Sequence, residues 1–206
     1  DLRGDWTDYV TGVVRELRAI GAAPSGALVA VSSTVPIGAG LSSSAALTVS
    51  AARALSSLAG RRLDGRSLAE IAYRAEHDQV GVLCGRMDQT IASLARPKHA
   101  LLFETATGEI TEVPMPARVL VIETGKSHRL TGGSLNDRRR ECEAALATLR
   151  GRWPDLAALC ALPPERLSEA EGLLSAVLFR RVRHLVTETA RTRRAAAALA
   201  AEDLAA

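Results

Sequence analysis

A run rich in glycine and serine at residues 36–47, PIGAGLSSSAAL, has the residue types and spacing of a phosphate site. Two glycines one residue apart allow a tight turn and a close approach of the backbone to a ligand. The serines lead into alanines with good helix propensity, which predicts a loop that opens into a helix. A helix N-terminus attracts phosphate, and serine hydroxyls bind phosphate or Mg²⁺. The alternative is a turn with a serine N-cap.

Three common motifs do not account for this run. A P-loop needs a lysine before its Ser or Thr, and the run contains no lysine. The dinucleotide-binding fingerprint fails because Ser43 stands where its third glycine belongs. The Gly-x-Ser-x-Gly turn of hydrolases is also missing from the run.

A second stretch, residues 75–89 with the sequence AEHDQVGVLCGRMDQ, contains two carboxylates of interest, Glu76 and Asp88. Taken alone, Glu76 reads as a solvated carboxylate on a helix, paired with Arg74 or His77. Asp88, in the first turn of a predicted helix, reads as a carboxylate stabilised by the helix dipole. Neither residue by itself indicates catalysis.

Both stretches resemble signature segments of the GHMP kinases, and the second narrows the resemblance to the galactokinases. The first is similar to Pro-x-Gly-x-Gly-Leu-Ser-Ser-Ser-Ala, and the second to a stretch that ends in Cys-Gly-x-Met-Asp-Gln. Residues 127–130 with 138–143 are similar to the family's Ser/Arg-His turn and Arg-rich helix, and residues 179–184 to a later galactokinase helix. The four segments follow the order of the family.

The resemblance implies an α+β fold. Residues 1–150 would form the GHMP kinase N-terminal ATP-binding domain, which is ribosomal protein S5 domain 2-like. Residues 151–206 would be the first helices of the GHMP C-terminal domain. Because the family's first and third motifs are not seen, we expect an internal piece of a longer kinase that is inactive in isolation.

The resemblance also implies a site that uses ATP and Mg²⁺. Asp88 would be the catalytic base that contacts the sugar, and Gly85 would let the sugar approach the backbone. Ser44 and Glu76 would be the Mg²⁺ ligands. The nucleotide would be held by Pro36, Gly38, Ala39, Gly40, Leu41, Ser42, Ser43 and Ser44.

The sugar is less firmly indicated than the reaction. Galactokinases often carry a galactose-contacting Tyr just before the Arg-rich helix, and Leu135 stands at that position. We expect transfer to the C1 hydroxyl of galactose. The alternatives are a kinase for another sugar, galacturonate or a heptose, or a non-catalytic sensor of sugar and nucleotide.

Composition is that of a globular enzyme rather than of a nucleic-acid or membrane protein. The 206 residues carry a net charge of +3 and only 3% aromatic residues, which leaves few platforms for stacking bases. Three cysteines, an odd number, argue against a disulfide scaffold and for a reducing compartment, the cytoplasm. No run is long and apolar enough for a membrane helix. We expect a monomer or weak dimer whose partners are the sugar and ATP.

Periodicity and turn residues predict alternating elements. Helices are expected at residues 7–20, 43–58, 67–80, 86–94, 134–150 and 175–202. Ser67 should cap the third of these, with Glu70 completing a capping box. Strands are expected at residues 27–32, 100–104 and 118–123.

Overall fold

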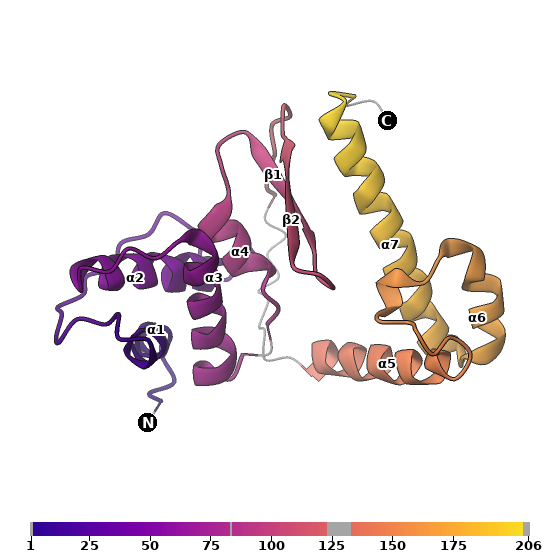
Figure 1. Cartoon of the computed structure of the whole chain (residues 1–206), viewed down its shortest axis with the longest axis horizontal. Coiled ribbons are helices and arrows are strands. Elements are labelled where there is room, and N and C mark those ends of the chain that lie inside the picture. Colours follow the sequence, from indigo (N-terminus) through magenta and orange to yellow (C-terminus); the bar gives the residue numbers. More distant parts are fainter. Residues whose placement is uncertain (1, 83, 123–132, 204–206) are drawn as a thin grey trace. The chain divides into compact units, whose positions relative to one another are not determined.

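Two compact units make up the chain in the computed structural model, which describes residues 2–82, 84–122 and 133–203, with the backbone alone for 133–136. The described part of unit 1 is residues 2–97 with 120–122, and that of unit 2 is residues 98–119 with 133–203. Unit 1 is helical, whereas unit 2 combines helices with a hairpin of two strands (Figure 1).

Unit 1 is built from helices that surround a small apolar core. Its elements are α1 (Thr7–Ala19), α2 (Ser43–Leu58), α3 (Gly65–Arg74), the π-helical segment η1 (Ala75–Val80) and α4 (Met87–Leu94). The fully buried Val13 and Leu17, one turn apart on α1, meet Leu55 of α2 and Leu68 of α3. The predicted helix at residues 43–58 is confirmed with the same bounds. Gly60, with φ of 72°, follows the end of the helix, where a glycine in this conformation is common.

The start and end of α3 differ from the expectation. The N-cap is Asp64, whose side chain accepts a hydrogen bond from the Ser67 N–H at 2.8 Å, so the assignment of Ser67 as the cap is wrong. The helix continues to Val80 as predicted, but its last six residues widen into η1. Gly81, with φ of 82°, ends it and begins the expected loop.

Two of the three predicted strands do not form. Residues 27–32 and 118–122 have no strand structure, and residue 123 lies outside the described residues. A strand needs a neighbour for its backbone groups, and no described segment pairs with either stretch. Apolar side chains there, such as Leu28 and Leu120, are exposed.

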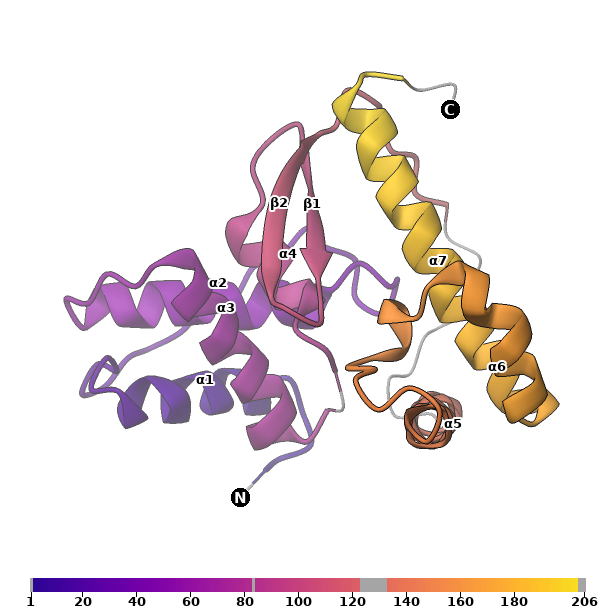
Figure 2. The same ribbon diagram turned by 45° about the vertical axis from the view of Figure 1, so that its right-hand side comes forward.

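Unit 2 begins with the third predicted strand, which pairs in an antiparallel hairpin. β1 (His99–Glu104) and β2 (Glu109–Pro114) lie side by side in both ribbon views, with Phe103 opposite Ile110 (Figures 1 and 2). Helices follow: α5 (Gly133–Arg150), the short 3₁₀ turns η2 (Leu159–Ala161) and η3 (Pro164–Arg166), α6 (Leu167–Leu173) and α7 (Ala176–Ala200). Ser175, where the expected helix begins, is the N-cap of α7, and its side chain accepts a hydrogen bond from the Leu178 N–H.

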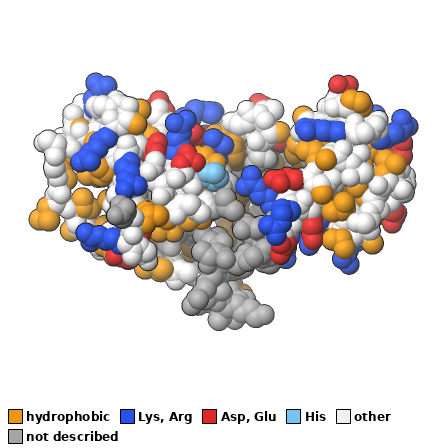
Figure 3. Space-filling view, turned by 90° about the horizontal axis from the view of Figure 1, so that it is seen from below, with side chains coloured by type: hydrophobic (Ala, Val, Ile, Leu, Met, Phe, Trp, Pro, Cys, Tyr) orange, Lys and Arg blue, Asp and Glu red, His pale blue; other side chains and the backbone are white. Residues whose placement is uncertain are grey.

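A second apolar core holds unit 2 together, centred on Leu149 of α5 and Val182 of α7. Because α5 packs on α7, the contacts do not divide the chain near residue 150. The domain bounds of 1–150 and 151–206 stay a prediction. Among the described residues no helix is long and apolar enough to cross a membrane. On the face in Figure 3, basic side chains are interspersed with acidic and uncharged ones.

Candidate functional site

The glycine- and serine-rich run forms a loop that leads directly into α2. Gly38 and Gly40 have φ of 76° and 73°, values that glycine adopts without steric strain. Ser42, the N-cap of α2, also has a positive φ, 54°, which is uncommon for a residue with a side chain. Pro36 and Leu41 are exposed, whereas Ala39 is half-buried. The loop therefore approaches α2 through left-handed turns at alternate residues.

The first turn of α2 offers free backbone donors beside this loop. The Ala46 N–H donates to the Ser42 carbonyl at 3.0 Å, which closes the first helical turn. The N–H groups of Ser43, Ser44 and Ala45 have no acceptor among the described residues. Unpaired donors and the helix dipole together favour an anion at this end.

A cavity of about 560 Å³ lies against the same end of α2. That volume lies within the range of small-molecule pockets. Its lining combines aromatic, apolar and hydroxyl side chains, including Trp6, Tyr9, Val31, Ile37, Ser43, Ser44 and Leu47. The apolar wall and the serine hydroxyls suit a ligand that is part flat and apolar and part charged.

Glu76 lies buried in η1, with 1% of its surface exposed. Its Oε1 accepts hydrogen bonds from Thr48 Oγ1 at 3.0 Å and from Gln89 Nε2 at 2.8 Å. No described residue hydrogen-bonds its other oxygen, Oε2. The alternative that paired Glu76 with Arg74 or His77 is wrong, because Arg74 binds Glu70 and His77 binds Asp78.

Thr48 and Tyr9 connect Glu76 to the loop and the cavity. Thr48 lies one turn after Ser44 on α2, and its Oγ1 is 3.0 Å from the Ser44 carbonyl oxygen. Burial, and next the charge of Glu76, raise the pKa of Tyr9, which also lines the cavity. The predicted ligands Ser44 and Glu76 therefore lie in one neighbourhood of unit 1.

Asp88 lies in the first turn of α4, directly before Gln89, and is half-buried. Among the described residues its carboxylate has no hydrogen bond or ion pair. Burial is the main cause of the raised pKa of the Cys84 thiol, and the charges of Glu76 and Asp88 add to it. The Gln89 amide nitrogen lies 2.8 Å from Glu76 Oε1 and 3.8 Å from Cys84 Sγ, so Glu76 and Cys84 share this neighbour. Gly85 is exposed, and a Cβ placed there would meet no atom within 4 Å.

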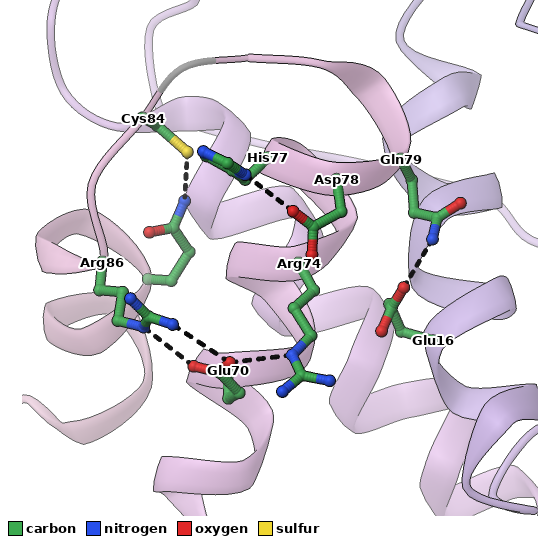
Figure 4. A network of polar contacts seen from close by, with 9 residues as sticks. Glu16, Glu70, Arg74, His77, Asp78, Gln79, Cys84 and Arg86 are labelled. Atoms are coloured by element: carbon green, nitrogen blue, oxygen red, sulfur yellow. Dashed lines mark hydrogen bonds and ion pairs between the residues drawn. The ribbon is translucent and has the colours of Figure 1, made fainter.

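Arg86, the residue between Gly85 and α4, contacts two side chains of α3. Arg86 Nε lies 3.1 Å from Glu70 Oε2, and Arg74 Nε lies 2.9 Å from Glu70 Oε1 (Figure 4). The Arg86 guanidinium also lies 4.1 Å from the centre of the Tyr73 ring. The hydrogen bond from Arg86 is the main reason that the pKa of Glu70 is lowered. These contacts fix the loop that carries Gly85 to α3.

Several residues of this neighbourhood were missed by the sequence analysis. Thr48 and Gln89 contact Glu76 across 28 and 13 positions. Gln89 ends the stretch at residues 75–89, but nothing in that pattern indicated its contact with Glu76. Trp6 and Tyr9 also line the cavity, although the sequence analysis predicted only a helix at residues 7–20 in this region. Residues 127–130 and the side chain of Leu135 lie outside the described residues.

Comparison with known proteins shows what the chain is similar to. Residues 8–96 match the family model for the GHMP kinases N terminal domain. The expected resemblance to the GHMP kinases and the α+β fold class are thereby confirmed.

Galactokinases are among the similar proteins. The chain is 42% identical to galactokinase from Chloroflexus aurantiacus and 41% identical to that from Chloroflexus aggregans, covering 99% of the chain and 53% of each relative. A crystal structure of Lactococcus lactis galactokinase complexed with galactose matches with a TM-score of 0.83 and 26% identity, over 99% of this chain and 54% of that one. The chain spans about half the length of the curated relatives it matches.

Proposed function

We propose that the protein carrying this chain is an ATP-dependent kinase that phosphorylates the C1 hydroxyl of galactose. One observation carries the proposal: a chain of contacts joins the three predicted parts of the site. Thr48, one turn from Ser44, hydrogen-bonds Glu76, and Gln89, next to Asp88, bonds the same Glu76 oxygen. The named galactokinase relatives, one of them complexed with galactose, support the choice of sugar.

The loop and the first turn of α2 are proposed to hold the phosphates of ATP. The unpaired N–H groups of Ser43, Ser44 and Ala45 would donate to phosphate oxygens, and Gly38 and Gly40 allow the backbone to come close. The cavity beside α2, with Trp6 and Tyr9 in its wall, would take the base and ribose. Aromatic walls suit a flat heterocycle.

Ser44 and Glu76 would hold Mg²⁺. The donor set fits, because a hydroxyl and a carboxylate oxygen suit a hard cation, and Oε2 of Glu76 is free of other described partners. No cluster of three His, Cys, Asp or Glu exists among the described residues, and a cation that keeps its waters and binds phosphate needs none. When bound, the ion would neutralise charge on the phosphates.

Asp88 would orient the sugar hydroxyl and accept its proton. The C1 oxygen attacks the γ-phosphorus, the bond from that phosphorus to the β–γ bridging oxygen breaks, and ADP leaves with the electron pair. The proton passes to the Asp88 carboxylate and then to solvent. An unpaired, half-buried carboxylate is available for this role. Gly85, with open space at its Cα, would leave room for the sugar ring.

The test is ATP turnover by the complete protein with galactose, galacturonate, a heptose, mevalonate and homoserine as acceptors. We expect turnover with galactose, and a loss of about 10²-fold or more in kcat for Asp88→Asn. Asp155→Asn, an exposed aspartate of unit 2, is the matched control and should keep full activity.

Other results would redirect the proposal. Turnover with galacturonate or a heptose alone would keep the kinase and replace its sugar. Saturable binding of sugar and nucleotide without turnover would make the protein a sensor. An active Asp88→Asn protein would remove Asp88 from catalysis.

The surroundings of the enzyme are also proposals. Cys84, Cys142 and Cys160 are all free, which supports a reducing compartment such as the cytoplasm. The monomer or weak dimer stays a prediction, to be measured by light scattering.

A further inference from the structure

The side chain of Gln89 is buried and joins the two carboxylates of the site. Gln89 is 1% exposed and follows Asp88 in α4. Its Nε2 donates to Glu76 Oε1 at 2.8 Å and lies 3.8 Å from Cys84 Sγ. Its Oε1 is the one buried side-chain oxygen or nitrogen among the described residues without a hydrogen-bond partner.

The unpaired oxygen makes Gln89 a poor choice for stability alone. A buried acceptor without a donor is unfavourable, whereas an apolar side chain of the same shape carries no such penalty. Methionine has a similar length and would fill the same space. The amide is therefore explained by what its other end does, which is to donate to Glu76.

The orientation of the amide is set by Glu76. Turning the amide over would place Oε1 against the Glu76 carboxylate oxygen, acceptor against acceptor. Thr48 donates to the same oxygen from α2. Two donors, one before and one after Glu76 in the sequence, therefore occupy its Oε1. Its Oε2 is left for another partner.

We propose that Gln89 is a positioning residue that fixes Glu76 as a magnesium ligand and ties it to the helix carrying Asp88. This inference rests on the proposed function of the same site. Partners that hydrogen-bond a metal-ligating carboxylate orient it, and their loss lowers metal affinity by about 10- to 100-fold. Because Gln89 and Asp88 are adjacent in α4, displacement of Gln89 also displaces the catalytic carboxylate.

The test compares metal binding by the complete protein and its Gln89→Met variant. Mn²⁺, detected by its paramagnetic resonance signal, replaces Mg²⁺ in the presence of a non-hydrolysable ATP analogue, so the readout does not need turnover. We expect the variant to bind Mn²⁺ about 10- to 100-fold more weakly. Its melting temperature should stay within about 4 °C of the unaltered protein, since the side-chain volume is kept.

Two further variants separate positioning from general damage to α4. Thr48→Val removes the other donor to Glu76 and should weaken Mn²⁺ binding in the same way. Ser93→Ala removes a different hydrogen bond of α4, the 2.7 Å bond to the Gly65 carbonyl, and should leave Mn²⁺ binding unchanged.

The outcomes separate this inference from the proposed function. If galactose turnover occurs and Gln89→Met binds Mn²⁺ as well as the unaltered protein, the inference is wrong and the kinase stands. If no acceptor is phosphorylated but Gln89→Met weakens Mn²⁺ binding and Ser93→Ala does not, the inference stands and the sugar kinase does not. If Ser93→Ala weakens Mn²⁺ binding as much as Gln89→Met does, Gln89 has only a structural role and the inference is wrong.

Discussion

The two carboxylates of the site differ in how they are held, and the difference matches different tasks. Glu76 is buried, with two donors on one of its oxygens. Asp88 is half-buried, at a helix start, without a described partner. A group that binds a cation benefits from rigid support, whereas a group that accepts a proton from substrate must present a free oxygen.

Gly85 offers a test of where the sugar lies. Its Cβ would meet no protein atom within 4 Å, so Gly85→Ala should fold with unchanged stability. If the sugar ring packs against this residue, one added methyl group should raise the KM for galactose by about 10- to 200-fold. Steady-state kinetics of the complete protein give the value.

Gly26→Ala is the matched control for Gly85. This exposed loop glycine also has open space around it, and its replacement should leave the KM unchanged. A Gly85→Ala protein with the original KM for galactose would show that the sugar does not approach the backbone there.

At this scale the sequence predicts the residues proposed to touch ligand, but not the contacts that support them. Ser44, Glu76 and Asp88 lie within segments whose types and spacing predict chemistry. The contacts of Thr48 and Gln89 with Glu76 become recognisable only when α2, η1 and α4 are packed, because the partner is distant along the chain. A resemblance to a motif does not reveal such contacts.

Among the elements, η1 carries Glu76 of the proposed site, and α1 packs closely against η1. A Cβ at Gly12 of α1 would lie 2.9 Å from the Ala75 carbonyl oxygen and 3.1 Å from Gln79 Cβ. Gln79 also donates to Glu16 at 2.7 Å, as Figure 4 shows. A glycine is therefore required where the two backbones meet.

Gly12→Ala should push α1 away from η1. Overpacking of this kind costs about 1–3 kcal/mol of unfolding free energy. Urea denaturation measures it, and Gly172→Ala in α6, where a Cβ meets nothing within 4 Å, is the control. That control should be neutral or stabilising by up to about 1 kcal/mol because alanine favours helix. Equal stability of the two variants would contradict the close approach.

Elements were predicted well where local sequence decides and poorly where partners decide. The bounds of α2 follow from helix propensity and a terminal glycine, which are local. The strands at residues 27–32 and 118–122 were inferred from side-chain pattern, but a strand forms only beside another strand. The π-helical form of η1 had no signal in the sequence.

On the scale of the molecule, the proposed catalytic parts all lie in unit 1. The loop, the cavity, Glu76 and Asp88 are within residues 2–97, whereas the core around Leu149 and Val182 belongs to unit 2. Each unit has an apolar core of its own. Local opening in one unit therefore need not break the contacts of the other.

Hydrogen exchange of the complete protein tests this division. A nucleotide at 100 times its Kd adds about 2.7 kcal/mol to any opening that destroys its site. We expect an ATP analogue with Mg²⁺, without sugar, to slow exchange in α2, η1 and α4 and to leave the buried part of α7 unchanged. Glu76→Gln, the control, should lose the increase that depends on Mg²⁺. Equal protection around Val182 would mean that nucleotide binding involves unit 2 as much as unit 1, and the placement of the whole nucleotide site in unit 1 would be wrong.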